Sequence, residues 1–334
     1  MDQSTTVHSD STPILPSVLA VGAIAATLLV ALLWTDRFGA VLEAASAVAD
    51  PLLRWWYVAL VAFLTALIVW LGLGRYKNVR LGRDDEQPEY SLLPWLAMLF
   101  AAGTGVGLLF WSIAEPISHF QGNPFVQEGL TPQAASVAVQ LSFFHWGLNG
   151  WAIFATVALI FAYFSYRRDL PLAPSSALYP VLGERAFGVL GQVVDALAVF
   201  ATVFGLATTL GLGARQTGTG LTWLFGVSGS TTVELLVVGV VTAVATVSVV
   251  SGVRRGVKVL SELNLWLTVV LLAGFLVLGP AGYLVGLLVQ ETGGYLDNLL
   301  SMTFYVGANE PGTWQSTWTV FFWGWWIAWS PFVG

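Results

Sequence analysis

Long apolar stretches, separated by short polar segments, run along the whole chain. An α-helix needs about 20 apolar residues to cross the hydrocarbon core of a bilayer. Strands of a membrane β-barrel would instead alternate apolar and polar residues over about ten positions, and these stretches do not alternate. The pattern predicts an all-α polytopic membrane protein with eight spans, at about residues 13–35, 53–74, 91–113, 136–164, 188–212, 232–252, 264–289 and 314–334.

The composition excludes an ordinary soluble domain. Hydrophobic residues make up 56% of the chain and charged residues 10%, whereas soluble proteins carry about 25% charged residues. The chain has no cysteine, so thiol catalysis, disulfides and cysteine metal sites are excluded. The net charge is −6, and there is no basic patch of the kind that binds nucleic acid. The expected partner is the lipid bilayer.

The basic residues fall on one side of the predicted spans. Ten of the 13 lysines and arginines follow the second, fourth or sixth span, whereas segments 115–135 and 290–313 contain none. Basic loops of membrane proteins remain in the cytoplasm. The sequence predicts a multi-pass protein of the cell membrane whose N-terminal tail, residues 1–12, is cytoplasmic. The ten residues are Arg75, Lys77, Arg80, Arg83, Arg167, Arg168, Arg185, Arg254, Arg255 and Lys258.

Two shorter segments have an amphipathic pattern. Segment 252–264 places valines and a leucine on one face and charged residues on another. Segment 291–307 has an apolar stripe of leucines and Phe304, with Glu291 outside it. We expect the first to lie along the cytoplasmic surface and the second along the outer surface. A plain solvated linker is the alternative interpretation of both.

Three glycines at alternate positions interrupt the third predicted span. They are Gly103, Gly105 and Gly107, with Thr104 between the first two. Glycines on both faces weaken a helix. An unwound stretch would offer carbonyls to a cation and amides to an anion. Close helix packing against Gly103 and Gly107 is the alternative.

Aromatic residues are concentrated in the fourth and eighth predicted spans. Trp146, Trp151 and Phe154 can share one side of a helix. Tryptophans at a membrane interface would explain the beginning of the eighth span, but not the tryptophans deeper within it. Aromatic faces attract cations, including quaternary ammonium groups, so these positions could bind such a solute. Packing against lipid or other helices is the alternative. The deeper tryptophans are Trp325, Trp326 and Trp329, and Pro331 beyond them predicts a helix break near Ser330.

The chain lacks enzyme motifs, such as a P-loop, H-E-x-x-H or G-x-S-x-G. Glu115, His119 and His145 lie near predicted span ends, where we expect them at the outer edge in local ion pairs. A membrane enzyme using these three side chains would require them to converge in a pocket, which their predicted loop positions do not favour. The sequence predicts neither an enzyme nor a cofactor.

The chain resembles the betaine/carnitine/choline transporter family. The resemblance lies in AAGTGVGLLFWSIAEPISHF (101–120), GLATTLGLGARQTGTGL (205–221) and FFWGWWIAWSPFVG (321–334), among other segments. It implies a LeuT-like fold of two inverted five-helix repeats after two peripheral helices. The matching segments are 13–74 for the peripheral helices, 91–289 for the first repeat, 291–307 for an outer amphipathic helix and 314–334 for the first helix of the second repeat. On this comparison the chain is truncated after that helix.

The resemblance also implies roles for individual residues. Trp146, Trp151 and Trp326 match an aromatic box, Phe154 stands where some members have tyrosine, and Trp329 matches a nearby substrate contact. Trp325 and the stretch Gly103, Thr104, Gly105 and Gly107 complete the implied substrate-binding set. Proton-coupled choline members carry aspartate at the position of Gly107, so the glycine favours sodium coupling. The implied sodium-binding residues are Thr202, Phe332, Ala101 and Thr104, with Leu206 where a second threonine ligand would stand.

The implied function is secondary active uptake of a quaternary-ammonium solute of the glycine betaine, choline or carnitine type. Symport with sodium, alternating access, a role in osmoprotection and a homotrimer are the properties that the resemblance suggests. The alternative is a transport-inactive membrane fragment that at most binds solute.

Overall fold

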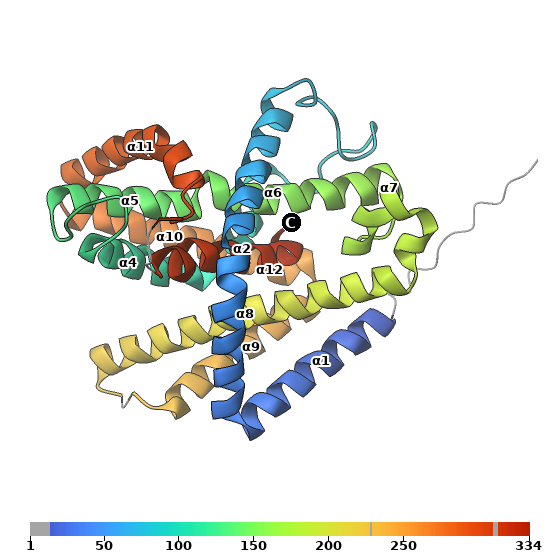
Figure 1. Cartoon of the computed structure of the whole chain (residues 1–334), viewed down its shortest axis with the longest axis horizontal. Coiled ribbons are helices and arrows are strands. Elements are labelled where there is room, and N and C mark those ends of the chain that lie inside the picture. Colours follow the sequence, from blue (N-terminus) through green and yellow to red (C-terminus); the bar gives the residue numbers. More distant parts are fainter. Residues whose placement is uncertain (1–13, 104, 228, 310–312) are drawn as a thin grey trace, which may run out of the picture.

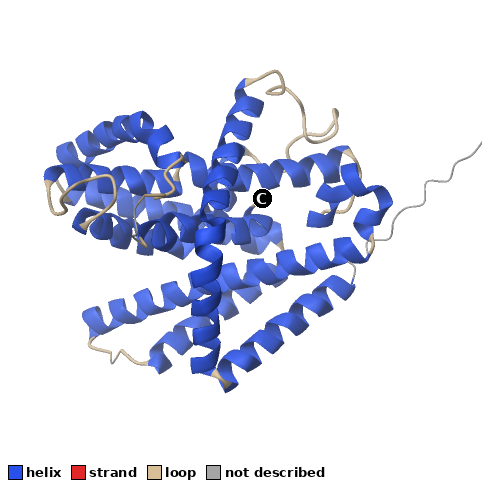
Figure 2. Ribbon diagram, viewed as in Figure 1, coloured by secondary structure: helices blue, strands red, loops and turns tan. Residues whose placement is uncertain are grey.

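The computed structural model describes residues 14–103, 105–227, 229–309 and 313–334, so the tail at 1–12 and Thr104 lie outside the described residues. All regular elements in the described part are helices (Figure 2). A backbone in lipid must satisfy its own hydrogen bonds, which helices do. The all-helical prediction is confirmed. The helices are α1 (Ile14–Leu33), α2 (Thr35–Leu73), α3 (Leu92–Gly103), α4 (Gly105–Gln121), α5 (Pro132–Trp146), α6 (Leu148–Ala162), η1 (Tyr163–Arg167), η2 (Pro174–Leu178), α7 (Tyr179–Leu182), η3 (Gly183–Phe187), α8 (Val189–Phe225), α9 (Thr231–Val250), η4 (Val253–Val257), α10 (Lys258–Leu278), α11 (Ala281–Thr303), η5 (Ser316–Val320) and α12 (Phe321–Val333).

Six helical segments in the described residues are long and apolar enough to cross a membrane, and α3 with α4 makes a seventh if they form one bent span. They correspond to the first seven predicted spans and support a multi-pass membrane protein. The eighth predicted span, 314–334, is not among them. In that segment η5 leads directly into α12. The second and fifth spans are longer than predicted, since α2 begins at Thr35 and α8 continues to Phe225.

Glycines divide the third and fourth predicted spans. The axes of α3 and of Gly107–Gln121 differ by 58°. Gly147 separates α5 from α6 with φ −98° and ψ −134°, and a Cβ at this position would overlap the carbonyl oxygen of Phe143. Only glycine allows so close an approach. The two breaks lie beside Gly103 and Trp146, which are both predicted to bind solute.

The predicted boundaries around the seventh span are wrong. Segment 252–264 is not a separate surface helix, because η4 leads directly into α10 and the Lys258–Glu262 ion pair (3.8 Å) lies on the first turns of α10. The predicted span at 264–289 ends early, at Leu278. Pro280 forces the residue before it out of the helical region, so the chain turns there and α11 begins at Ala281.

Helix α11 directs polar side chains toward the protein. Glu291 is 1% exposed and accepts hydrogen bonds from Ser136 (2.8 Å) and Gln140 (2.7 Å) of α5. Leu296 and Leu300 are 56% and 71% exposed. The apolar stripe therefore faces outward, which suits contact with lipid, while polar groups face the bundle.

Helix α12 lies near the centre of the molecule and packs against α6 and α8 (Figure 1). The predicted break near Ser330 is wrong, because α12 continues through Pro331 to Val333. Pro331 has no N–H for the carbonyl of Ile327. The hydroxyl of Ser330 donates to that carbonyl instead (2.8 Å), which explains how the helix tolerates the proline.

Ion pairs join the segments that follow the second, fourth and sixth predicted spans. Arg83 contacts Asp169 (2.8 Å), and Arg254 contacts Glu89 (3.0 Å). The segments on which the basic residues are concentrated therefore lie on the same side of the molecule, as the charge pattern requires.

Candidate functional site

Helices α5, α6 and α12 bring the predicted aromatic residues together. Trp146 ends α5, and Trp151 and Phe154 lie on α6 just after the break at Gly147. Three of the four tryptophans of α12, Trp325, Trp326 and Trp329, stack on one another, with ring centroids 5.0 to 5.9 Å apart. We call the whole set the aromatic cluster; it consists of Trp146, Trp151, Phe154, Trp325, Trp326 and Trp329.

The rings of the aromatic cluster contact one another directly. Trp146 meets Trp326 edge to face, with ring centroids 4.8 Å apart, and Phe154 meets Trp326 in the same way at 5.4 Å. Trp326 stacks on Trp325 at 5.0 Å and on Trp329 at 5.8 Å. Trp151 joins the cluster through Phe154, at 5.7 Å. The structure therefore brings together all six predicted aromatic residues, and they pack against protein.

The glycines of α3 and α4 make room for these rings. A Cβ on Gly103 would lie 2.7 Å from the Cη2 atom of Trp151, and a Cβ on Gly107 would lie 3.1 Å from that of Trp325. These separations are shorter than ordinary carbon contacts of about 3.5–4.0 Å. The bent α3–α4 pair therefore closes one side of the aromatic cluster. Gly105 begins α4, and Thr104 lies outside the described residues.

Hydrogen bonds from the indole N–H groups orient three of the rings. Trp146 donates to Oε2 of Glu115 (2.8 Å), Trp325 to the carbonyl of Gly205 (3.1 Å) and Trp326 to the carbonyl of His145 (3.1 Å). The buried N–H of Trp329 has no partner among the described residues.

Glu115, His119 and His145 form a buried cluster directly beside Trp146. All three side chains are 0% exposed and converge, so the expectation that their predicted loop positions keep them apart is wrong. The local pairing that was expected is present, between Glu115 and each histidine. Oε1 of Glu115 lies 2.5 Å from Nδ1 of His145 and 3.3 Å from Nε2 of His119. Helix α4 continues past its predicted end and so carries Glu115 inward, where α5 supplies His145. We call these three residues the carboxylate–histidine cluster.

The remaining ring nitrogens of the carboxylate–histidine cluster also have partners. Nε2 of His145 lies 3.0 Å from the hydroxyl of Thr319, and Trp314 donates to Nδ1 of His119 (3.4 Å). All groups are satisfied if each histidine donates one N–H to Glu115 and accepts at its other nitrogen. One carboxylate oxygen of Glu115 and one ring nitrogen of each histidine lie within 4.8 Å of one another, a spacing that would suit a metal ion. The hydrogen bonds described above already use these atoms.

Two of the residues implied for sodium, Thr202 and Phe332, lie on or beside α12, and Thr104 lies outside the described residues. Thr202 of α8 donates a hydrogen bond to the carbonyl of Ala328 (3.3 Å). Phe332, one turn further along α12, is 53% exposed. Ala101 is half-buried on α3, and Leu206 packs against the aromatic core. Their role in ion binding remains a prediction.

The groups that hold the aromatic cluster in place are not evident from the sequence. Glu115 was predicted to lie at the outer edge in a local ion pair or, as the alternative, to take part in catalysis, and the carbonyls of Gly205 and His145 carry no signal in the sequence. Thr319 was not singled out. A carboxylate only eight residues beyond Gly107, followed by a histidine at i+4, could have been recognised as the continuation of one helix face.

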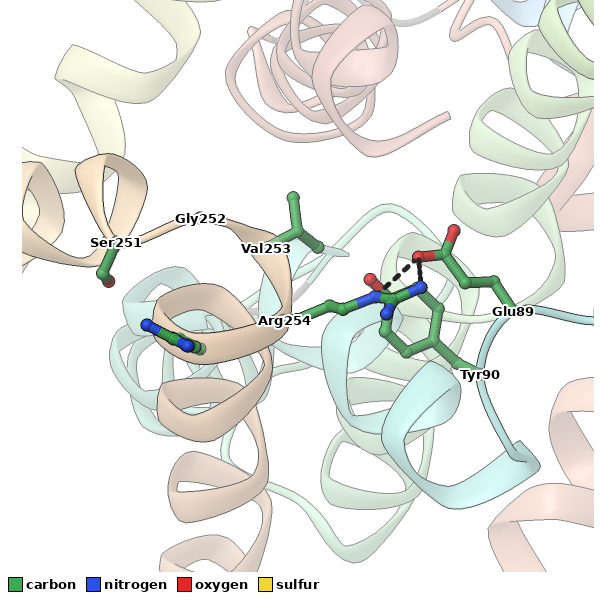
Figure 3. A pocket seen from close by; sticks show the side chains of 7 residues that line it. Glu89, Tyr90, Ser251, Gly252, Val253 and Arg254 are labelled. Atoms are coloured by element: carbon green, nitrogen blue, oxygen red, sulfur yellow. Dashed lines mark hydrogen bonds and ion pairs between the residues drawn. The ribbon is translucent and has the colours of Figure 1, made fainter.

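An open pocket with a volume of about 520 Å³ lies apart from the aromatic cluster. The segment before α3 and the turn between α9 and η4 form its walls (Figure 3). Arg254 spans it and donates to Glu89 from Nε (3.1 Å) and Nη2 (3.0 Å). This pocket has charged walls and lies among the segments predicted to be cytoplasmic.

The architecture is that of a polytopic α-helical membrane protein whose core is built on packed aromatic rings. The chain belongs to the betaine/carnitine/choline transporter family, whose model matches residues 16–334. The members of this family are transporters, so the prediction that the chain is not an enzyme is confirmed.

Several transporters are similar to the chain. It is 41% identical over 280 residues to a probable glycine betaine transporter of Desulfitobacterium hafniense, covering 84% of the chain and 56% of the relative. It is 40% identical over 318 residues to the glycine betaine transporter OpuD of Bacillus subtilis, covering 95% and 62%. It is 42% identical over 281 residues to the high-affinity choline transport protein of Escherichia coli K12, covering 84% and 41%. The chain thus spans about half the length of these relatives.

Proposed function

We propose that the protein takes up a quaternary-ammonium solute of the glycine betaine or choline type by secondary active transport. The observation that carries this proposal is the convergence of Trp146, Phe154 and Trp326 from three helices, with ring centroids 4.8 and 5.4 Å apart. A methylated cation has no N–H to donate, so aromatic faces are its natural binding surface. The relatives named above transport glycine betaine or choline, which supports the same solute class.

The packed rings place a requirement on binding. At a centroid separation of 4.8 Å, Trp146 and Trp326 fill the space between them. A trimethylammonium group could enter only if one ring moved aside. Solute binding should therefore change the environment of buried tryptophans and be visible in their fluorescence.

Further features of the mechanism belong to the proposal. We propose that sodium drives uptake, with Thr202 near its site, and that the helices form the first of two inverted repeats in a LeuT-like fold. Rocking of one repeat against the other would give alternating access. We also propose a cytoplasmic N-terminus, because the basic segments lie together on one side, and a homotrimeric assembly. Carnitine remains a candidate solute.

The replacement Trp326→Leu tests the proposed function. Each cation–π contact contributes about 0.5–2 kcal/mol, so loss of the ring at the centre of the cluster should raise the KM for radiolabelled glycine betaine by about tenfold. Trp266→Leu is the matched control, because Trp266 is exposed on α10 and lies outside the cluster.

Uptake should be measured in cells that lack other betaine transport, with and without a sodium gradient. Unchanged uptake by a folded Trp326→Leu variant would refute the aromatic site. Uptake by the unmodified chain that ignores the sodium gradient would refute sodium coupling but leave the aromatic site in place.

A further inference from the structure

The indole N–H groups of Trp146 and Trp326 point at neighbouring acceptors. Trp146 donates to Oε2 of Glu115 (2.8 Å), and Trp326 donates to the main-chain carbonyl of His145 (3.1 Å). An indole has one donor and no acceptor, so the direction of its single hydrogen bond fixes how the ring is turned. Glu115 and His145 are themselves in contact, at 2.5 Å. The acceptors that orient the rings of Trp146 and Trp326 therefore belong to two residues, Glu115 and His145, that contact each other.

The carboxylate of Glu115 is held from three sides. His145 and His119 contact Oε1, and Trp146 contacts Oε2. The residue is 0% exposed, and among the described residues the titratable side chains that contact it are the two histidines. A buried carboxylate is tolerated only when it is fully hydrogen-bonded, and a partly satisfied network costs more than none. The carboxylate of Glu115 is therefore fixed in the orientation in which all three of these contacts are made.

On the side away from Glu115, His145 contacts η5 and the beginning of α12. Thr319 of η5 is 1% exposed, and its hydroxyl lies 3.0 Å from Nε2 of His145. The ring of His145 also stacks on Phe322 of α12, with centroids 4.7 Å apart. The chain of contacts thus runs from η5 through His145 and Glu115 to Trp146, and joins α4, α5 and α12.

We propose that Glu115 is a positioning residue for solute binding: it fixes the ring of Trp146 against Trp326, and His145 and Thr319 hold it in place. The proposal rests on the proposed function, since it assumes that these rings bind the methylated cation. Glu115 need not touch the solute. A merely structural role, in which the network only holds helices together, is the competing explanation.

Two variants of Glu115 separate the hydrogen bond from the charge. Glu115→Gln keeps an oxygen that can accept from the indole of Trp146, whereas Glu115→Leu removes every acceptor. In the full chain in lipid nanodiscs, the Kd for glycine betaine is measured by tryptophan fluorescence. We expect Glu115→Leu to raise the Kd about 3- to 30-fold, the range that loss of one cation–π contact gives. Glu115→Gln should stay within about threefold.

A matched carboxylate controls for lost stability. Glu291 is equally buried and hydrogen-bonded by α5, but its hydrogen bonds go to Ser136, Gln140 and Gln290 and not to the aromatic cluster. Glu291→Leu should lower the melting temperature yet leave the Kd within about twofold. An equal rise in Kd in Glu291→Leu and Glu115→Leu would overturn the proposal in favour of the structural role.

A milder pair of variants covers the case in which Glu115→Leu does not fold. Thr319→Val removes the hydroxyl that contacts His145 while keeping the shape of the side chain. Thr317→Val is its control, because the hydroxyl of Thr317 is exposed and, within the described part of the chain, donates only to the carbonyl of Thr313. We expect about a threefold rise in Kd for Thr319→Val and no change for Thr317→Val. Equal values for both would count against the proposal.

A spectroscopic measurement separates failure of this inference from failure of the proposed function. With ¹⁵N-labelled tryptophan, the indole N–H signal of Trp146 is assigned by its loss in Trp146→Phe. It should move in Glu115→Leu and in Thr319→Val and stay in place in Glu291→Leu. An unmoved signal in folded Glu115→Leu would overturn the positioning role. If the unmodified chain binds neither glycine betaine nor choline, the proposed function fails, while the signal still reports whether Glu115 orients the ring.

Discussion

Replacement of Gly103 by alanine adds one carbon at the closest approach between α3 and the aromatic cluster. The new Cβ would lie 2.7 Å from Cη2 of Trp151 and 3.3 Å from its Cζ2. Carbon atoms in ordinary contact are about 3.5–4.0 Å apart, so the ring or the helix must move by about 1 Å. Trp151 cannot move freely, because it packs edge to face on Phe154 at 5.7 Å. A displacement of Trp151 by the new Cβ should therefore also displace Phe154 and the rest of the aromatic cluster.

Two opposing effects set the size of the change. Overpacking in a filled interior costs about 1–3 kcal/mol, whereas alanine stabilises a helix by up to about 1 kcal/mol relative to glycine. We expect a net loss of about 0–2 kcal/mol in stability for Gly103→Ala, and a rise in the Kd for glycine betaine. Gly205→Ala is the matched control, since its Cβ would lie 3.7 Å from the nearest atom, an ordinary contact.

The assay compares both alanine variants in lipid nanodiscs by thermal unfolding and by titration with glycine betaine. Gly205→Ala should melt at or above the temperature of the unmodified chain and bind normally. The reasoning would be refuted if Gly103→Ala bound solute as tightly as Gly205→Ala and melted at the same temperature. That outcome would mean that the ring of Trp151 can shift enough to accommodate a Cβ on Gly103 without disturbing the aromatic cluster.

Two further predictions concern stability. Ser330→Ala leaves the carbonyl of Ile327 without a donor, because Pro331 supplies none, and should lower the free energy of unfolding by about 1–3 kcal/mol in a thermal assay. The control Ser301→Ala removes an exposed hydroxyl of α11 that makes the same i to i−3 hydrogen bond, and should change the stability little. Equal losses in the two variants would refute the account of how α12 tolerates proline. Burial acts to raise the pKa of Glu291, but hydrogen bonds from Gln140 and its other partners outweigh this and hold the pKa below its ordinary value. The stabilisation from Glu291 is therefore complete above the ordinary glutamate pKa and is lost as the pH falls through the lowered pKa. Melting temperatures between pH 7 and pH 3 should fall less steeply in Glu291→Gln, and parallel curves would contradict this.

The sequence by itself determined the class of the protein and identified the residues of the aromatic cluster. Apolar runs of about 20 residues can be stable only in lipid, and this holds whatever their neighbours are. Charge along the chain indicated which segments lie together, and the ion pair between Arg254 and Glu89 agrees with it. Glycine spacing predicted where the third span is weak, because glycine lacks a Cβ wherever it occurs.

Only the tertiary structure decided how polar groups near the helix ends are used. Thr319 is 174 residues from its partner His145, so no local pattern could reveal the contact. The same applies to Glu291, whose partners on α5 turn the polar side of α11 inward. Ser330 is an exception, because its hydrogen bond to the carbonyl of Ile327 is local, three residues back along the same helix. Local sequence fixes what a segment prefers, but a buried polar group takes whichever partner the packing of distant helices brings within about 3 Å, since leaving it unpaired costs more than any local preference.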